Sequence, residues 1–262
     1  MNHDQLFHSM HDGLLMLPNC WDGGSARVAQ AAGATALATS SAAVAWSHGY
    51  ADGSHLPTEL LLATVRGIRR VSDLPLSVDI EDGYSADPAG VAVLVRELIG
   101  AGVVGINIED GSDAPELLAS KIAIVREVAD AAGVRLFINA RTDVYLRGLV
   151  DAGGKPAETI RRGALYRAAG ASGLFVPGVS DEGDIATIAA AVALPLNVMA
   201  LPGLSAPGRL RELGVRRLSA GSAIGEAAQG LVRDAAAAFL ATGRVAAPSP
   251  GYGALNALMV SG

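Results

Sequence analysis

Short apolar runs alternate with longer amphipathic stretches along most of the chain. The runs predict eight β-strands, at Leu14–Leu17, Ala34–Thr39, Leu76–Ile80, Val103–Ile108, Arg135–Ala140, Gly173–Val176, Leu194–Met199 and Arg216–Ser219. Most of these runs are continuously apolar, which is typical of parallel strands covered on both faces. Apolar residues at three- and four-residue spacing predict helices between the strands, among them Thr58–Val71, Asp87–Gly100, Pro115–Ala132 and Glu158–Ala169. A further helix, Ala223–Thr242, is predicted after the last strand.

This alternation predicts an α/β protein built as a (β/α)₈ TIM barrel, because eight strand–helix units fit within about 240 residues. A doubly wound open sheet is the alternative architecture, but the segment after the first strand, Pro18–Asp22, lacks the glycine-rich phosphate turn of that fold. We predict one barrel domain over residues 1–243. Residues 244–262, rich in Pro, Gly and Ser at their start, are predicted to form a C-terminal tail.

Composition narrows the possible partners and the compartment. The net charge is −6 and there is no run of Lys or Arg, which argues against nucleic acid or an anionic membrane as a partner. Cys20 is the only cysteine, which excludes an internal disulfide and fits a reducing cytoplasm. Met1–Phe7 lacks the features of a secretory signal, and no apolar stretch is long enough to cross a bilayer. The sequence therefore predicts a cytoplasmic protein that binds a small molecule.

Polar residues gather where the predicted third, fourth and fifth strands end. Strand side chains alternate between faces, so Asp79 shares a face with Glu81, as Glu109 does with Asn107 and Arg141 with Asn139. Barrel enzymes bind their ligands at these carboxyl ends. Crowded carboxylates without paired His or Cys favour a hard cation, Mg²⁺ rather than Zn²⁺. The pattern predicts a metal and anion site at one end of the barrel.

Structural roles compete with chemical ones for several of these residues. Asp82 and Asp110 lie at the start of loops, where they would equally well cap a helix or pair with arginine. The Arg141 guanidinium would clamp a substrate carboxylate or phosphonate, or form an ion pair with Glu109, and the two roles are compatible. Asp52, in a glycine-rich loop after the second strand, is on these grounds no more than a turn aspartate.

An ordered set of motifs resembles the isocitrate lyase/phosphoenolpyruvate mutase superfamily. The matching segments are Asn19-Cys20-Trp21-Asp22, Thr39-Ser40-Ser41, Gly49-Tyr50-Ala51-Asp52, Val78-Asp79-Ile80-Glu81-Asp82-Gly83-Tyr84-Ser85 and Ile108-Glu109-Asp110. They span roughly Pro18 to Ser222 and fall at the ends of successive predicted strands. Members of this superfamily cleave or form C–C or P–C bonds beside an α-oxo carboxylate, through an enolpyruvate-like anion.

The resemblance implies roles for individual residues. It implies Mg²⁺, or alternatively Mn²⁺, near Asp79, with Glu81 and Glu109 as further metal-site residues that act through water. It implies catalytic roles for Asp52, Glu109 and Arg141. Substrate-binding residues by the same comparison are Trp21, Ser40, Ser41, Ala42, Asp79, Arg141 and Asn197. Members are commonly tetramers that exchange a C-terminal helix, so we expect a homo-oligomer, a dimer or tetramer, with Ala223–Thr242 as the exchanged helix.

The chain also departs from its superfamily in ways that bear on the reaction. The isocitrate and methylisocitrate lyases have a K-K/R-C-G-H loop after the fourth strand, whereas Glu109–Pro115 here leads directly into a helix without Cys or His. Pro177 stands where those lyases have an acid, and Glu81 replaces the usual Asp. We therefore predict a Mg²⁺-dependent lyase that cleaves a C–C bond of a small α-oxo or 2-hydroxy di- or tricarboxylate. A P–C bond hydrolase or mutase on a phosphonopyruvate-like compound, or a non-catalytic α-oxo acid binder, are the alternatives.

Overall fold

The strands of the computed structural model, which describes residues 2–245 and 247–260, form one parallel sheet. Its nine strands are β1 (Leu15–Leu17), β2 (Asn19–Cys20), β3 (Leu37–Thr39), β4 (Leu76–Asp79), β5 (Gly105–Glu109), β6 (Phe137–Arg141), β7 (Gly173–Val176), β8 (Leu196–Met199) and β9 (Val215–Ser219). β1 pairs with β9 and β2 with β3, so the two segments that flank Pro18 act as one strand that closes the sheet. Proline has no N–H for the ladder, which accounts for the interruption. The predicted (β/α)₈ barrel is confirmed.

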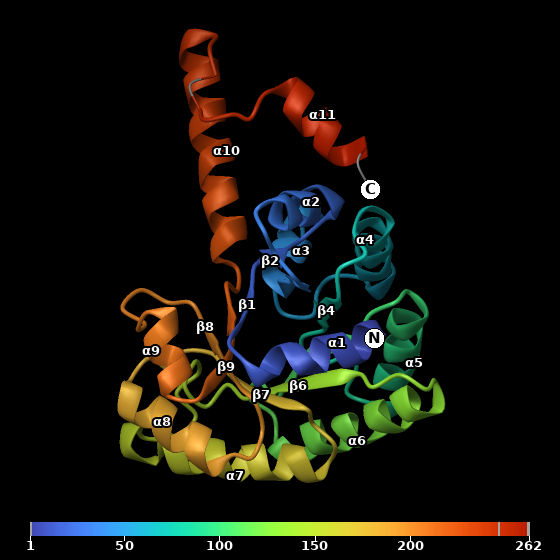
Figure 1. Ribbon diagram of the computed structural model, residues 1–262, viewed down its shortest axis with the longest axis vertical. Helices are drawn as coiled ribbons and strands as arrows, with labels where there is room; N and C mark the ends of the chain where they lie inside the picture. Colours follow the sequence, from blue (N-terminus) through green and yellow to red (C-terminus); the bar gives the residue numbers. More distant parts are fainter. Residues whose placement is uncertain (1, 246, 261–262) are drawn as a thin grey trace.

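Helices follow the strands and surround them (Figure 1). They are α1 (His3–Ser9), α2 (Gly23–Ala31), α3 (Ser41–Ser47), α4 (Thr58–Val71), α5 (Pro88–Gly100), α6 (Pro115–Ala131), α7 (Lys155–Ala168), α8 (Glu182–Ala191), α9 (Pro207–Glu212), α10 (Ala223–Thr242) and α11 (Tyr252–Val260). Proline in the first turn begins α5 and α6, and the Asp87 side chain caps α5 by accepting the Ala89 N–H. α7 begins three residues before the predicted Glu158, at Lys155.

The interior of the barrel is polar, whereas the layer between strands and helices is apolar. Val78, Ile106 and Ile138 are fully buried among helix residues. Their strand neighbours Asp79 and Asn107 face the opposite way and are also buried. The alternation along each strand therefore separates a packed outer core from an inner column of polar groups.

The amino ends of the strands are closed by aromatic rings. α1 lies across this end, and its Phe7 is 5.6 Å from Phe137 of β6 in an edge-to-face arrangement. The His11 ring stacks on Phe137 at 3.9 Å, and its Nδ1 bonds to the Phe7 carbonyl at 2.8 Å. Gly105 and Gly173 supply the room, because a Cβ at either would lie 2.8 Å from a phenylalanine ring.

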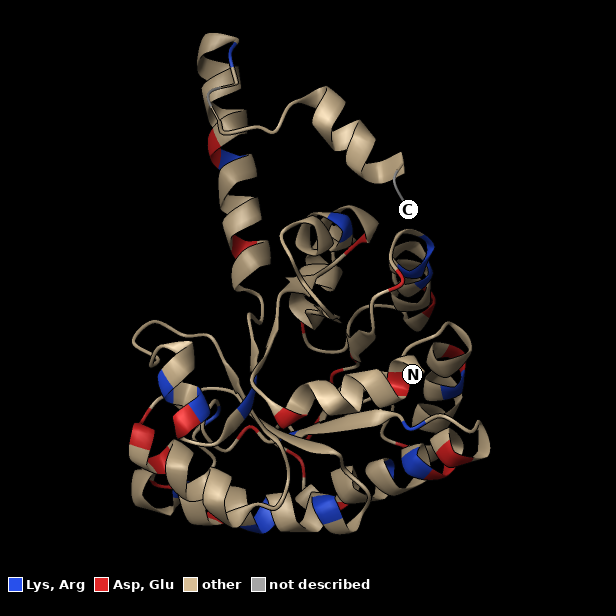
Figure 2. Ribbon diagram, viewed as in Figure 1, with Lys and Arg blue, Asp and Glu red and all other residues tan. Residues whose placement is uncertain are grey.

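α10 extends away from the barrel, and α11 returns toward α2 and α4 (Figure 1). Most of α10 and all of α11 lack charged side chains (Figure 2). Large apolar residues of α10 are exposed, among them Val232 at 62% and Leu240 at 84%. No helix in the described part of the chain combines the length and apolar character needed to cross a membrane.

The predicted tail, residues 244–262, contains α11, which the sequence analysis did not assign as a helix. Arg27 of α2 donates from Nε to the Leu258 carbonyl at 3.0 Å and so joins the tail to the barrel. Residues 246, 261 and 262 of this tail lie outside the described residues. The boundary at residue 243 stays a prediction, as does the exchange of α10 between subunits.

Candidate active site

A polar pocket of about 230 Å³ opens at the carboxyl ends of the strands. Six predicted site residues lie around it, namely Ser40, Ser41, Ala42, Asp52, Asp79 and Arg141. The other lining residues are Asn19, Asn107, Leu146, Phe175, Pro177, Met199, Ser219, Gly221 and Ser222. The structure thus brings together groups from at least five strands and from the loop that contains Asp52.

Asp79, the last residue of β4, is held at the base of the pocket. Its Oδ1 accepts the Glu81 N–H at 3.1 Å, and its Oδ2 accepts the Asn107 amide at 3.3 Å. Burial raises the pKa of the Asp79 carboxyl, and the positive charge of Arg141 opposes that rise. Each oxygen accepts one of these hydrogen bonds, so each retains acceptor capacity toward the pocket.

Arg141, the last residue of β6, is fixed by two carboxylates. Its Nε and Nη2 bond to the two oxygens of Asp143 at 2.7 and 3.0 Å, and its Nη1 lies 2.6 Å from Glu109 Oε2. The predicted ion pair with Glu109 is therefore present. A guanidinium has five N–H donors, so these contacts leave one on each terminal nitrogen for an anion in the pocket. The guanidinium also lies over the Phe175 ring, at 5.9 Å.

Glu109 pairs with Arg141 and does not line the pocket. Burial raises the pKa of the Glu109 carboxyl to about 8, the Arg141 charge opposes the rise, and Asp79 and Asp143 add to it. Acids at the ends of neighbouring strands thus disfavour the ionised form of Glu109.

Glu81 forms a strained junction with the loop that contains Asp52. It accepts hydrogen bonds from the backbone N–H and hydroxyl of Ser54 and, at 2.7 Å, from the Tyr84 hydroxyl. Ser54, Glu81 and Tyr84 all have positive φ angles, of 60°, 52° and 55°. Left-handed conformations of non-glycine residues are costly and concentrate at functional sites. Glu81 therefore fixes the loop in place, and its oxygens are turned away from the pocket.

Asp110 has a structural role, which was one of the two alternatives. Its Oδ2 accepts hydrogen bonds from Arg162 at 2.8 Å and Tyr166 at 2.5 Å, and its Oδ1 accepts the Asp143 N–H at 2.9 Å. The side chain is fully buried. Asp110 thereby supports the carboxylate that holds Arg141.

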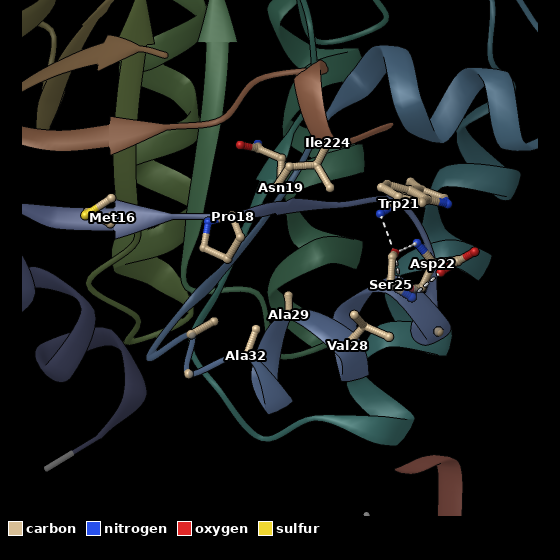
Figure 3. A pocket seen from close by; sticks show the side chains of 13 residues that line it. Met16, Pro18, Asn19, Trp21, Asp22, Ser25, Val28, Ala29, Ala32 and Ile224 are labelled. Atoms are coloured by element: carbon tan, nitrogen blue, oxygen red, sulfur yellow. Dashed lines mark hydrogen bonds between the residues drawn. The ribbon is translucent and has the colours of Figure 1, made fainter. Parts of the chain in front are cut away.

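Two predicted substrate-binding residues, Trp21 and Asn197, lie away from the strand-end pocket. Trp21 lines a larger, mostly apolar cavity of about 630 Å³ between β1, α2 and the start of α10, together with Val28 and Ile224 (Figure 3). Asn197 is buried in the barrel and bonds to Ser219 Oγ at 3.2 Å and to backbone carbonyls. The smaller pocket is the better candidate for chemistry because charged groups converge there.

Sequence reasoning missed part of the site. Ser219 and Ser222, at and after the end of β9, line the pocket, and neither was among the predicted site residues. The run Ser219-Ala220-Gly221-Ser222 after an apolar strand was the signal that would have found them. Asn107 was recognised as a strand-end residue, but its contact with Asp79 needed the pairing of β4 with β5.

The donors around Asp79 suit a hard cation. No group of three or more His, Cys, Asp or Glu side chains in residues 2–245 and 247–260 is arranged as a cluster of metal ligands. The three predicted metal-site acids, Asp79, Glu81 and Glu109, therefore do not converge on one point. Mg²⁺ needs only one or two direct carboxylates, since waters complete its shell. Asp79 fits as a direct ligand, because it is buried, retains acceptor capacity and lines the pocket.

Comparison with known proteins identifies the family of this chain. A family model described as phosphoenolpyruvate phosphomutase matches residues 7–240. Uncharacterized protein Rv1998c of Mycobacterium tuberculosis (strain H37Rv) is 38% identical over 223 residues, which are 82% of this chain and 81% of that protein. Oxaloacetate decarboxylase 1 of Pseudomonas fluorescens (strain Pf0-1) is 34% identical over 155 residues, 57% of this chain and 53% of that protein.

Solved structures share the whole fold. A Burkholderia cenocepacia protein provisionally described as a phosphonomutase has a TM-score of 0.84 and 40% identity, over 88% of this chain and 98% of that chain. Phosphonopyruvate hydrolase in complex with oxalate and Mg²⁺ has a TM-score of 0.85 at 23% identity, over 98% of this chain and 95% of that chain. The chain therefore belongs to the phosphoenolpyruvate phosphomutase family of enzymes, within the superfamily that its motifs predicted.

Proposed function

We propose that this protein is a Mg²⁺-dependent lyase that cleaves a C–C bond of a small α-oxo or 2-hydroxy di- or tricarboxylate. The observation that carries the proposal is the convergence of Asp79, Arg141 and Asp52 on one pocket of about 230 Å³. That volume is below the usual range for drug-sized ligands, about 300–1,000 Å³, and suits a compact acid.

The residues of the pocket would divide the work between binding and chemistry. The two unused N–H groups of Arg141 would clamp a substrate carboxylate, and the surrounding carboxylates would hold the guanidinium in position. Ser40, Ser41 and Ala42, at the start of α3, would face the oxygen of the α-oxo group. Asp79 would hold a Mg²⁺ ion, which would act as a Lewis acid and stabilise the negative charge that develops in an enolate-like reaction.

Asp52 would act from the solvent side of the pocket. Its loop is fixed by Ser54 and Glu81, and Asp52 is exposed, so it would orient the substrate from the side that faces water. The Cys-containing loop of the isocitrate and methylisocitrate lyases is replaced here by Glu109–Pro115. This replacement favours a reaction that needs no protonation by cysteine, such as decarboxylation or cleavage of a small oxo acid.

The relatives supply two candidate reactions. Oxaloacetate decarboxylase, at 34% identity, cleaves a C–C bond, and this is the support for our preferred reaction. The Burkholderia cenocepacia protein provisionally described as a phosphonomutase is 40% identical to this chain. It supports P–C bond chemistry on a phosphonopyruvate-like substrate as the second candidate. The Arg141 fork suits a phosphonate as well as a carboxylate, so the pocket does not by itself separate these candidates.

A substrate panel tests the proposal directly. We would incubate the protein with oxaloacetate, phosphonopyruvate or 2-methylisocitrate and Mg²⁺, and measure pyruvate and phosphate. We expect turnover of one of the carboxylates, and we expect this turnover to be lost when EDTA is added and in Asp79→Ala. Phosphate release, or conversion of phosphonopyruvate to a phosphate ester followed by phosphorus NMR, would establish the second candidate instead. Binding of all three without turnover would show a non-catalytic α-oxo acid binder, and equal rates in Asp79→Ala would exclude the metal role.

We also propose that the chain forms a homo-oligomer through α10. The support is the exposed apolar surface of this 20-residue helix, which includes Leu231, Val232, Phe239 and Leu240. Such a surface is unfavourable in water without a partner. Light scattering would show a dimer or tetramer for the wild type, and a smaller species for Val232→Glu/Leu240→Glu.

A further inference from the structure

One arginine is enclosed inside the barrel, below the pocket. Arg217 of β9 is 0% exposed and is among the largest fully buried side chains. Its Nη2 donates to Asn107 Oδ1 at 3.2 Å, but Nε and Nη1 have no hydrogen-bond partner among the residues that the structure describes. A buried charge without full pairing is expensive, so its presence calls for an explanation beyond packing.

Arg217 determines which way the Asn107 amide points. A guanidinium can only donate hydrogen bonds, so the Asn107 atom that faces it must be the oxygen. The Asn139 amide donates to the same oxygen at 2.9 Å. The Asn107 nitrogen is then directed at Asp79 Oδ2, at 3.3 Å. A chain of directed hydrogen bonds thus runs from Arg217 through Asn107 to Asp79.

The electrostatic environment fits the same arrangement. Burial lowers the pKa of the Arg217 guanidinium to about 9, and the charge of Asp79 opposes this shift. The guanidinium is therefore positively charged at neutral pH. On the other side of Arg217, burial and the Arg217 charge lower the pKa of His11 to about 3, so that ring is neutral. Asp79 is the acidic group whose negative charge raises the pKa of Arg217.

We propose that Arg217 is a positioning residue, which holds the Asn107 amide and through it the Asp79 carboxylate in the orientation that binds the divalent cation. The inference rests on the proposed function in that the cation is the one assigned to Asp79. Arg217 lies below the lining of the pocket and contacts neither substrate nor metal. Its role explains why a poorly paired charge is retained in the barrel.

The test compares three variants. In Arg217→Met the side chain keeps its approximate length but loses its charge and donors, and we expect Mn²⁺ binding to weaken about 10- to 100-fold, as for other partners of metal ligands. The melting temperature should stay the same or rise, because removal of a poorly paired buried charge is often stabilising. Arg217→Lys should restore part of the Mn²⁺ affinity.

Arg126→Met is the matched control. Arg126 of α6 is partly buried and bonds to the carbonyls of Leu136 and Gly170 and to Ser172 Oγ, which precede the first residues of β6 and β7, and it does not line the pocket. Its loss should lower the melting temperature and leave Mn²⁺ affinity unchanged. The opposite pattern for Arg217→Met, a lower melting temperature with unchanged Mn²⁺ affinity, would assign Arg217 a structural role only.

Crystal structures of the metal-free proteins separate this inference from the proposed function. In Arg217→Met the Asn107 and Asp79 side chains should rotate from their wild-type positions. Unchanged positions would overturn the positioning role, whatever the protein binds. A wild-type protein that binds no Mn²⁺ would contradict the proposed function alone, and the two metal-free structures would still decide the role of Arg217.

Discussion

The two ends of the barrel are made from the same strands but differ in chemistry. The mouth, formed by Asp79, Glu81, Glu109 and Arg141 with the Asp52 loop, holds acids whose pKa values are raised by burial, and three non-glycine residues with positive φ lie in or beside it. The floor, formed by Phe7, His11, Ser77, Gly105, Phe137 and Gly173, is neutral and packed around aromatic rings.

This difference shows how one strand serves two purposes. Along β6, Phe137 packs at the floor and Arg141 reaches the mouth, four residues apart. Packing at the floor stabilises the folded protein, whereas the crowded acids and strained residues at the mouth destabilise it. Substitutions at the mouth should therefore change activity, and those at the floor should change the free energy of unfolding.

The largest expected effect is at the mouth, in Arg141→Lys. A lysine cannot bond to Asp143 twice and to Glu109 at once while it clamps a substrate. We expect kcat/KM to fall by about 100-fold or more, since a misplaced binding group typically costs that much. Steady-state kinetics on the substrate that the panel identifies measures it. Arg147→Lys is the matched control, because Arg147 also pairs with Asp143 but is half exposed and does not line the pocket.

The next effect is at the floor, in Gly173→Ala. The added methyl would lie 2.8 Å from the Phe137 ring and 2.9 Å from Asn139 Oδ1, closer than packing permits. Overpacking of this kind costs about 1–3 kcal/mol, which urea unfolding would measure. Activity at low temperature should persist. Gly153→Ala, where the methyl meets nothing within 4 Å, should change little, and equal losses in both variants would contradict the close packing.

The fold was largely predictable because its signal is local. Eight apolar runs and the helices between them follow from periodicity, and α4 and α10 have the predicted ends. The exceptions are instructive. Pro18 divides the first strand into β1 and β2 by removing one N–H, and α11 forms in a tail whose start has a loop-like composition. Neither depends on the spacing of apolar residues.

The site was predictable where a side chain lies at a strand end and less so elsewhere. Asp79, Arg141 and Ser40 line the pocket because every parallel strand ends at the same face. Asn197 and Arg217 lie lower in the barrel, and whether an inward residue reaches the pocket depends on strand stagger. Glu81 points instead to Ser54, because of a backbone φ that the sequence does not reveal.

His11 gives the floor a dependence on pH. Its pKa is lowered to about 3, by burial first and then by the Arg217 charge, from an ordinary value of 6.5. Between these values the unfolded chain binds a proton that the folded protein does not, so stability falls as pH falls. From pH 6.5 to 5.5 this single site should contribute a loss of about 1 kcal/mol.

Urea unfolding at both pH values measures this contribution as the difference between wild type and His11→Asn. The asparagine amide nitrogen corresponds to the histidine Nδ1, so it can still donate to the Phe7 carbonyl, but it does not titrate. Acids at the mouth with raised pKa values act in the opposite direction, and the subtraction removes their part. An identical pH dependence in the two proteins would mean that folding does not lower the pKa of His11.

The smallest expected effect is in Ser77→Ala, two residues before Asp79 on the same face of β4. Ser77 is 1% exposed, and its hydroxyl has no hydrogen-bond partner among the residues that the structure describes. Removal of an unpaired buried hydroxyl should change the free energy of unfolding by less than about 0.5 kcal/mol, and in the stabilising direction. Catalytic constants should match the wild type, which urea unfolding and kinetics would check together. A loss of activity in Ser77→Ala would show that the floor and the mouth are coupled through β4, and would end the separation on which the other predictions depend.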